Sequence, residues 1–208
     1  MIVYEHKGLP NPVRVRIALA EKNATAFAEF IQVDVLAGEC RTQEFTAKNP
    51  SAAVPVLELD DGTCISECSA IIDYIDAAFE GTSLTGETAK EKAVITMFQR
   101  RAESGVLEAF SAGFHHATNG LGPELETYQN KDWGQHQISK ALSTLGYFDQ
   151  VLASSEFVAG DKFSDADITL YAGILLGAFT NSKVPEQCIH LLAWQARMQS
   201  RTSIKGLD

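Results

Sequence analysis

Residues 49–69 read NPSAAVPVLELDDGTCISECS and predict a short hairpin that runs directly into a helix. Val54-Pro55 marks a strand start, because proline lacks an amide donor and biases the residue before it to an extended conformation. The Asp-Asp-Gly run at 60–62 supplies the turn, and apolar residues at helical spacing follow Glu67. An extended backbone edge beside a helix N-terminus can hydrogen-bond an extended peptide and hold its carboxylate.

The residues before this stretch predict alternating strands and helices. Asparagine favours the cap of a helix and proline favours its first turn. Alternating side chains favour a strand. We expect a strand at 2–4, a helix with Asn11 as cap and Pro12 in its first turn that ends near Lys22, a strand at 29–35 and a helix at 43–48. The expected order up to residue 80 is therefore β-α-β-α-β-β-α.

The character of the chain changes after residue 80, because no convincing strand follows. We expect a linker at 81–87, one long helix over 89–112, a helix at 134–153, a helix opened by a capping box at Ser164–Asp167, and a last helix that starts at Pro185. The predicted fold class is thus α/β plus all-α. A small α/β domain spans 1–80 and an all-helical domain spans 88–208.

Composition narrows the function classes. The chain has 208 residues, of which 45% are hydrophobic, and this suffices for a substantial core. A formal net charge of -10 argues against nucleic-acid binding. We find no apolar run long enough to cross a bilayer and no signal-peptide pattern after Met1. Four scattered cysteines do not indicate a disulfide scaffold, so we expect a cytoplasmic protein without membrane association.

Three stretches resemble the cytosolic glutathione S-transferases: Asn49 to Cys68 with its Val54-Pro55-Val56-Leu57 run, the Arg14–Leu19 helix, and Phe163–Ile168. The resemblance covers nearly the whole chain. It implies a thioredoxin-like N-terminal domain that binds glutathione, a helical-bundle C-terminal domain that shapes a second-substrate pocket, and a homodimer. Residues 114–118, followed by 120–123, resemble an atypical fungal and bacterial branch of that family.

The resemblance implies a glutathione site in the N-terminal domain. Val54 would pair its backbone with the cysteinyl part of the tripeptide, with Pro55 in the cis form. Glu67, expected as a buried charged partner, and Cys68 would hold the γ-glutamyl end, and Lys48 would meet the glycyl carboxylate. A serine is usual at the position of Cys68, and a thiol is a poorer hydrogen-bonding group than a hydroxyl. Each of these residues also has an explanation that involves no ligand. Val54-Pro55 could serve only to start a strand, Glu67 could be a charge favoured by the helix dipole, and Lys48 could be a solvated surface lysine.

The usual catalytic residue is missing. Most members of the family activate the thiol of glutathione with a Tyr, Ser or Cys just after the first strand, where this chain has Leu9, while Tyr4 lies too early. The absence of a cysteine there disfavours a mixed-disulfide mechanism. A thiol has a pKa near 8.5, and lowering it by about two units stabilises the thiolate by roughly 2.7 kcal/mol.

Three groups are candidates for this activation. Asn11 lies at a helix N-terminus, although it is as readily a plain helix cap. His115 and His116 come from the helical domain, where the atypical branch is expected to use a His and a hydroxyl to hold a water that donates to sulfur. Thr118 is the candidate hydroxyl. Adjacent residues on a helix diverge by about 100°, so at most one His can point at the site, and we expect His116.

The second-substrate pocket is expected to be apolar. Its candidate lining residues are Leu9, Phe110, Phe114, Thr118 and Leu121, although the aromatic and aliphatic ones are also typical core residues. The histidines show no metal-ligand pattern, and glutathione enters as a substrate, so we expect no metal and no cofactor.

The sequence leaves three functional alternatives. We expect a detoxifying transferase that conjugates glutathione to small hydrophobic electrophiles through an activated thiolate. A glutathione-dependent peroxidase would use the same thiolate. A non-catalytic binding module with this fold is the remaining alternative, favoured by the missing Tyr, Ser or Cys.

Overall fold

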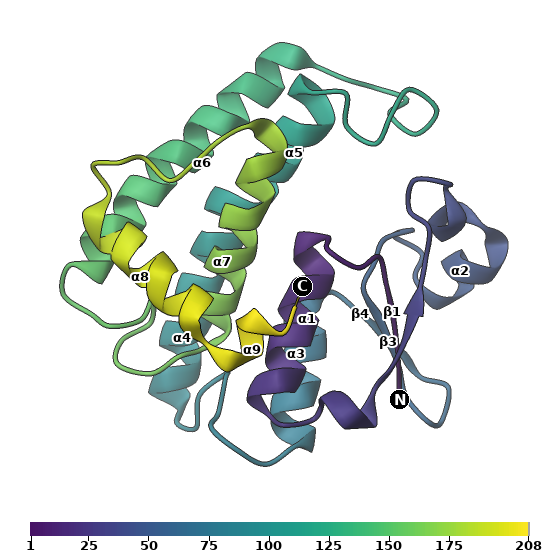
Figure 1. Cartoon of the computed structure of the whole chain (residues 1–208). Coiled ribbons are helices and arrows are strands. Elements are labelled where there is room, and N and C mark those ends of the chain that lie inside the picture. The colour runs from purple at the N-terminus through teal and green to yellow at the C-terminus, as the bar shows by residue number, and fades with distance from the viewer. Residues whose placement is uncertain (208) are drawn as a thin grey trace. The chain divides into compact units, whose positions relative to one another are not determined.

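The computed structural model describes residues 1–207, which form two compact units (Figure 1). The N-terminal unit comprises residues 1–84 together with 206 and 207, and the helical unit comprises residues 85–205. Each unit is built around its own core.

The N-terminal unit is a mixed four-stranded sheet with helices on both faces. Its strands are β1 (Ile2–Glu5), β2 (Glu29–Gln32), β3 (Val56–Glu58) and β4 (Cys64–Ser66), in the order β2-β1-β3-β4. Strands β1 and β2 are parallel, and the other two pairings are antiparallel. Figure 1 shows α1 (Pro10–Glu21) and α3 (Cys68–Ala78) on one side of the sheet and α2 (Gln43–Lys48) on the other. Short 3-10 turns, η1 (Thr25–Phe27) and η2 (Glu39–Arg41), complete this thioredoxin-like domain.

The alternation of β1 sets its two faces. Val3 and Glu5 are fully buried on one face, where Glu5 pairs with Arg16 of α1. Tyr4 points to the opposite face and packs edge-on against Phe45 of α2. Side chains of a strand alternate between faces, so this single strand connects both helical layers.

Two sequence predictions in this unit need correction. Helix α1 begins at Pro10, with Leu9 rather than Asn11 as its cap residue, because proline fits both the first and the third helical position, neither of which needs an amide donor. Strand β2 ends at Gln32 rather than at residue 35, because its register partner β1 ends at Glu5. The hairpin turn agrees with its prediction, since Gly62 has a φ of 84°.

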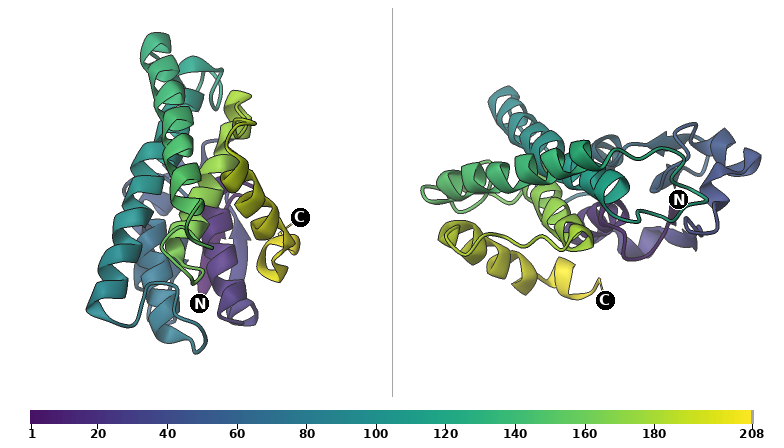
Figure 2. Two further views of the ribbon diagram at one scale, coloured as in Figure 1. Left: turned by 90° about the vertical axis from the view of Figure 1, so that its left-hand side faces the viewer. Right: turned by 90° about the horizontal axis from the view of Figure 1, so that it is seen from above.

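The helical unit contains α4 (Ala89–Ala102), a π-helical segment η3 (Glu103–Leu107), α5 (Glu108–Ala117), α6 (Lys131–Leu152), α7 (Asp165–Gly177), the 3-10 turn η4 (Ala178–Thr180), α8 (Ile189–Ser200) and α9 (Thr202–Lys205). Figure 2 shows α5 and α6 side by side. Their contact is close, because a Cβ added at Gly134 of α6 would lie 2.7 Å from the backbone nitrogen of Ala117.

The long helix expected over 89–112 instead continues to Ala117 and contains the π-helical segment. This segment lies where α7 crosses, since a Cβ on Gly173 would come within 2.9 Å of Val106. Segments of this kind are often found at functional sites. The local periodicity of the sequence does not reveal it.

The sequence predicts the start of α7 correctly but not the start of α8. The capping box at Ser164 is confirmed, and Asp167 completes it by accepting from the Ser164 amide. The predicted start at Pro185 is wrong, because α8 begins at Ile189. Asp149 of α6 caps α8 by accepting from the amides of His190 and Leu191, a partner distant in sequence.

None of the helices in the described part of the chain is both long enough and apolar enough to span a bilayer.

Candidate functional site

The segment before β3 presents a backbone edge. Asn49 is buried and organises it, donating from Nδ2 to the Ala53 carbonyl at 2.7 Å and accepting from the Ser51 amide at 3.0 Å. The Val54–Pro55 peptide bond is cis. Within residues 1–207 we find no hydrogen-bond partner for the amide or the carbonyl of Val54. Asn49 thus holds an extended backbone whose polar groups are open to a ligand.

The start of α3 follows the same hairpin. Glu67 precedes the helix with a φ of 70°, a left-handed conformation that is strained for a residue with a side chain. The first helical bond runs from the Ile71 amide to the Glu67 carbonyl. The Glu67 side chain is exposed, so the expectation of a buried carboxylate is wrong. An exposed carboxylate beside a helix start suits a ligand that carries both an ammonium group and a carboxylate.

A buried cation lies behind this helix start. Arg14 of α1 is 1% exposed and donates to the hydroxyl of Ser69 at 3.3 Å. The thiol of Cys68 is also buried and bonds to the carbonyl of Asn11 at 3.4 Å, so it joins α3 to α1. The guanidinium and the helix dipole both favour an anion at this point. Arg14 is a candidate functional residue that the motifs did not predict, although an arginine among the apolar residues of its helix is an unusual feature.

Lys48 is engaged by its own neighbours. Its Nζ lies 2.6 Å from Oε2 of Glu58 and 4.8 Å from the centroid of the Tyr4 ring, and the Tyr4 hydroxyl donates to the same carboxylate oxygen at 2.9 Å. The hydrogen bond with Glu58 raises the pKa of Lys48, and the same bond lowers the pKa of Glu58. Burial raises the pKa of Tyr4, and its hydroxyl proton is already donated to Glu58. Lys48 would have to share its charge with Glu58 to bind a ligand carboxylate.

The start of α1 offers one amide. Pro10 and Pro12 have no N–H, and the Val13 amide donates to the carbonyl of Leu9 at 3.1 Å. Asn11 therefore carries the one N–H in residues 10–13 that lacks a helical carbonyl partner, and its side chain is exposed. Leu9 is half-buried in the turn just before.

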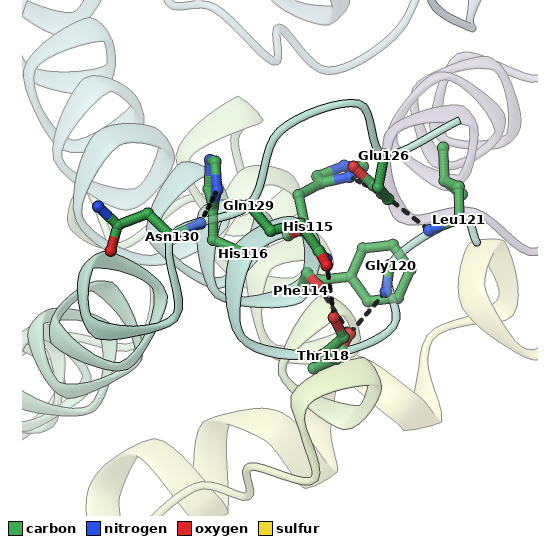
Figure 3. Close-up of polar contacts among 9 residues, drawn as sticks. All are labelled: Phe114, His115, His116, Thr118, Gly120, Leu121, Glu126, Gln129 and Asn130. Atoms are coloured by element: carbon green, nitrogen blue, oxygen red, sulfur yellow. Dashed lines mark hydrogen bonds and ion pairs between the residues drawn. The ribbon is translucent and has the colours of Figure 1, made fainter. Parts of the chain in front are cut away.

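The end of α5 brings the two histidines to a loop (Figure 3). Nδ1 of His115 lies 2.7 Å from Oε1 of Glu126, and the same oxygen accepts from the Leu121 amide at 2.8 Å. Nδ1 of His116 accepts from the Asn130 amide at 3.2 Å. The pKa of Glu126 is affected by burial, which raises it, but the bonds from Leu121 and His115 outweigh burial and lower it overall.

Thr118 closes the same helix end. Its hydroxyl donates to the carbonyl of Phe114 at 2.6 Å and accepts from the Gly120 amide at 3.0 Å, and Gln129 donates to the carbonyls of His115 and Thr118. These bonds already use the donor of the hydroxyl that was expected to hold a water. Ser111 precedes His115 by four residues and is half-buried on the same face of α5.

The proposed pocket residues divide between core and periphery. Phe110 is 1% exposed and packs in the core, within 3.3 Å of a Cβ placed on Gly177. Phe114 is half-buried and packs edge-on against Phe179, which is 42% exposed. Leu121 is half-buried in the loop held by Glu126. Within residues 1–207, no three His, Cys, Asp or Glu side chains gather as a metal site would require.

Two family models match the chain. The glutathione S-transferase N-terminal domain matches residues 1–77, and the glutathione S-transferase C-terminal domain matches residues 122–206.

Similar proteins agree with these matches. Glutathione S-transferase 2 of Saccharomyces cerevisiae is 53% identical over 207 residues, which cover 100% of this chain and 89% of that protein. The crystal structure of Gtt2 from S. cerevisiae has a TM-score of 0.98 at 53% identity and covers 100% of both chains. A glutathione S-transferase domain-containing protein from Marinobacter aquaeolei VT8 has a TM-score of 0.97 at 57% identity, covering 98% of this chain and 100% of that one.

Proposed function

Because this chain belongs to the glutathione S-transferase family and is such an enzyme, we propose that it conjugates reduced glutathione to small hydrophobic electrophiles. The thiol gives up its proton, and the sulfur then uses its electron pair to bond to an electrophilic carbon. A leaving group departs with the electrons of the bond that breaks. Holding the two substrates close together and activating the thiolate would accelerate the conjugation relative to the uncatalysed reaction.

The binding part of the proposal is supported by the N-terminal unit. The observation that carries it is the open backbone of Val54 next to the start of α3. An extended tripeptide would pair with Val54 and place its γ-glutamyl carboxylate at the amides of the α3 start, where Arg14 adds positive charge. Glu67 would accept from the α-ammonium group, and Lys48 would meet the glycyl carboxylate.

The activation part relies on groups outside the usual position. Asn11 offers its amide at the start of α1, and His115 and His116 offer ring nitrogens at the end of α5. Lowering the thiol pKa by about two units needs roughly 2.7 kcal/mol, which two or three groups that stabilise the thiolate, by hydrogen bonding or by positive charge, can supply. Leu9, Phe114, Thr118 and Leu121 would line the apolar pocket, whereas Phe110 belongs to the core of the helical unit.

The biological setting is part of the same proposal. A permissive apolar pocket suits a detoxifying enzyme that accepts many electrophiles. We propose that the enzyme acts in the cytoplasm as a homodimer, as the family resemblance implies.

The test combines binding with turnover. The protein is passed over immobilised glutathione, and conjugation of a chromogenic aryl halide is measured on the eluted fraction. The proposal expects retention and turnover together. Retention without turnover would contradict the enzyme and support a binding module of the same fold.

A further inference from the structure

Two adjacent histidines at the end of α5 are held by partners of opposite hydrogen-bonding character (Figure 3). The partner of His115 is a carboxylate, which only accepts when ionised, and the partner of His116 is a backbone amide, which only donates. In a neutral imidazole one ring nitrogen donates and the other accepts, and the partner decides which is which. The two rings are therefore not equivalent in chemistry.

His115 must carry a proton on Nδ1. Its contact with Glu126 Oε1 is 2.7 Å, and the Leu121 amide donates to the same oxygen, as it would to an anionic carboxylate. The Glu126 side chain is only 11% exposed, so it is well held. In the neutral ring the lone pair is then on Nε2, and this nitrogen is a proton acceptor.

His116 has the reverse arrangement. The Asn130 amide donates to its Nδ1 at 3.2 Å, so that nitrogen keeps its lone pair and the neutral ring carries its proton on Nε2. The Tyr128 ring packs edge-on against the imidazole with 5.9 Å between centroids. Neutral His116 can thus donate from Nε2, whereas it has no lone pair left there to accept a proton.

The Glu126 carboxylate occupies the space where Gly120 lacks a side chain. Gly120 has a φ of 53°, and a Cβ at this position would lie 2.2 Å from Oε1 and 2.6 Å from Cδ of Glu126. A side chain at residue 120 would therefore displace the carboxylate from His115. The contact between Glu126 and His115 depends on the absence of that side chain.

We propose that Glu126 is a positioning residue that fixes His115 as the proton acceptor of the site. The Asn130 amide leaves neutral His116 with a donor at Nε2, so His115 replaces His116 as the histidine expected to take the thiol proton. The role in thiol activation rests on the function proposed above. In that step the S–H bond of glutathione breaks and its electron pair stays on sulfur. The proton forms a new bond to Nε2 of His115, directly or through one water, and Glu126 stabilises the imidazolium that results.

The assignment is tested in the ligand-free protein by long-range proton–nitrogen NMR of the histidine rings, at a pH where both are neutral. We expect the Nδ1–H form for His115 and the Nε2–H form for His116. Glu126→Ala should shift His115 toward the Nε2–H form and leave His116 unchanged. Glu124→Ala, which removes an exposed charge from the same loop, is the matched control and should change neither ring. The Nε2–H form for His115 in the wild-type protein would overturn the inference.

Kinetics separates the inference from the proposed function. Glu126→Ala should lower kcat about tenfold, a part of the usual contribution of a general base, and leave the KM for glutathione unchanged. Glu126→Gln preserves the shape of the side chain and covers the case in which the alanine variant misfolds; it should also lower kcat. If the two rings show the expected opposite tautomers but the protein has no turnover, the proposed function is contradicted and the tautomer assignment stands. Turnover that is equal in wild type and both Glu126 variants would refute the role of Glu126.

Discussion

The start of α3 and the end of α5 present their candidate residues in different states. At the start of α3, Glu67 is exposed and the backbone of Val54 has open hydrogen-bonding groups. At the end of α5, His115, His116 and Thr118 each bond to residues of the loop that follows, up to Asn130. The first region presents mainly backbone groups. The second is a network in which specific side chains already have hydrogen-bond partners within the chain.

The two regions should tolerate different substitutions. A site made of backbone groups and a helix dipole depends little on side-chain identity, apart from a few charges. A network in which one atom serves two partners, as Oε1 of Glu126 does, loses both bonds when the side chain that carries this atom is removed. Binding and turnover should therefore respond to separate sets of substitutions.

The largest effect is expected at Glu67. Glu67→Ala removes the acceptor for the α-ammonium group of glutathione, and a hydrogen bond to a charged group contributes about 1.5–3 kcal/mol. The dissociation constant for glutathione, measured by calorimetry, should rise at least about tenfold. Glu80→Ala removes a similar exposed charge just beyond the other end of α3 and serves as the control. Equal affinity in the wild type and the Glu67 variant would remove Glu67 from the site.

A smaller effect on turnover is expected at Thr118. Thr118→Val keeps the shape of the side chain but removes bonds to Phe114 and Gly120, each contributing about 1 kcal/mol. We expect kcat to fall several-fold while retention on immobilised glutathione is unchanged. Thr127→Val, on the exposed part of the same loop, should leave both values as they are. Loss of retention in the Thr118 variant would contradict the separation of glutathione binding from turnover between the two regions.

The Lys48–Glu58 pair predicts a modest pH effect on stability. The folded state lowers the pKa of Glu58 from 4.5, mainly through its bond with Lys48, so the pair stabilises the protein above that pH. This contribution is lost as pH falls through the lowered pKa. Wild type should unfold in urea with about 0.5–1 kcal/mol more free energy than Glu58→Gln at neutral pH. The difference should vanish in acid, and a constant difference across pH would contradict the assigned cause.

The smallest effect is expected at Val54. Val54→Ala shortens the side chain but keeps both backbone groups, so glutathione affinity should stay within about twofold, well under the effect of losing one hydrogen bond. Calorimetry on this variant beside Glu67→Ala separates backbone recognition from side-chain recognition. A large loss at Val54 would show that the first region also depends on side-chain identity.

The sequence predicted the parts of the fold that depend on local chemistry. The Asp-Asp-Gly turn with Gly62, the capping box at Ser164 and the helix at 43–48 all rest on neighbours within a few residues, and the structure agrees with them. The predicted start of α8 failed because its cap, Asp149, is supplied by α6. The π-helical segment also has no local signal, since it lies where α7 crosses.

The candidate site shows the same limit. Val54, Pro55 and Glu67 were named from a motif in which hairpin and helix are continuous in sequence. Glu126 was missed because its link to His115 spans eleven positions of loop and needs a glycine at 120. Arg14 was missed because its partner Ser69 lies on a different helix. Such partners become visible only when the chain is folded.

The most direct measurement is a crystal structure of the protein with glutathione bound at saturating concentration. We expect the cysteinyl backbone to pair with the amide and carbonyl of Val54, and the γ-glutamyl group to lie between Glu67 and the start of α3. Glutathione bound at another surface, or no glutathione along Val54 under these conditions, would contradict this expectation.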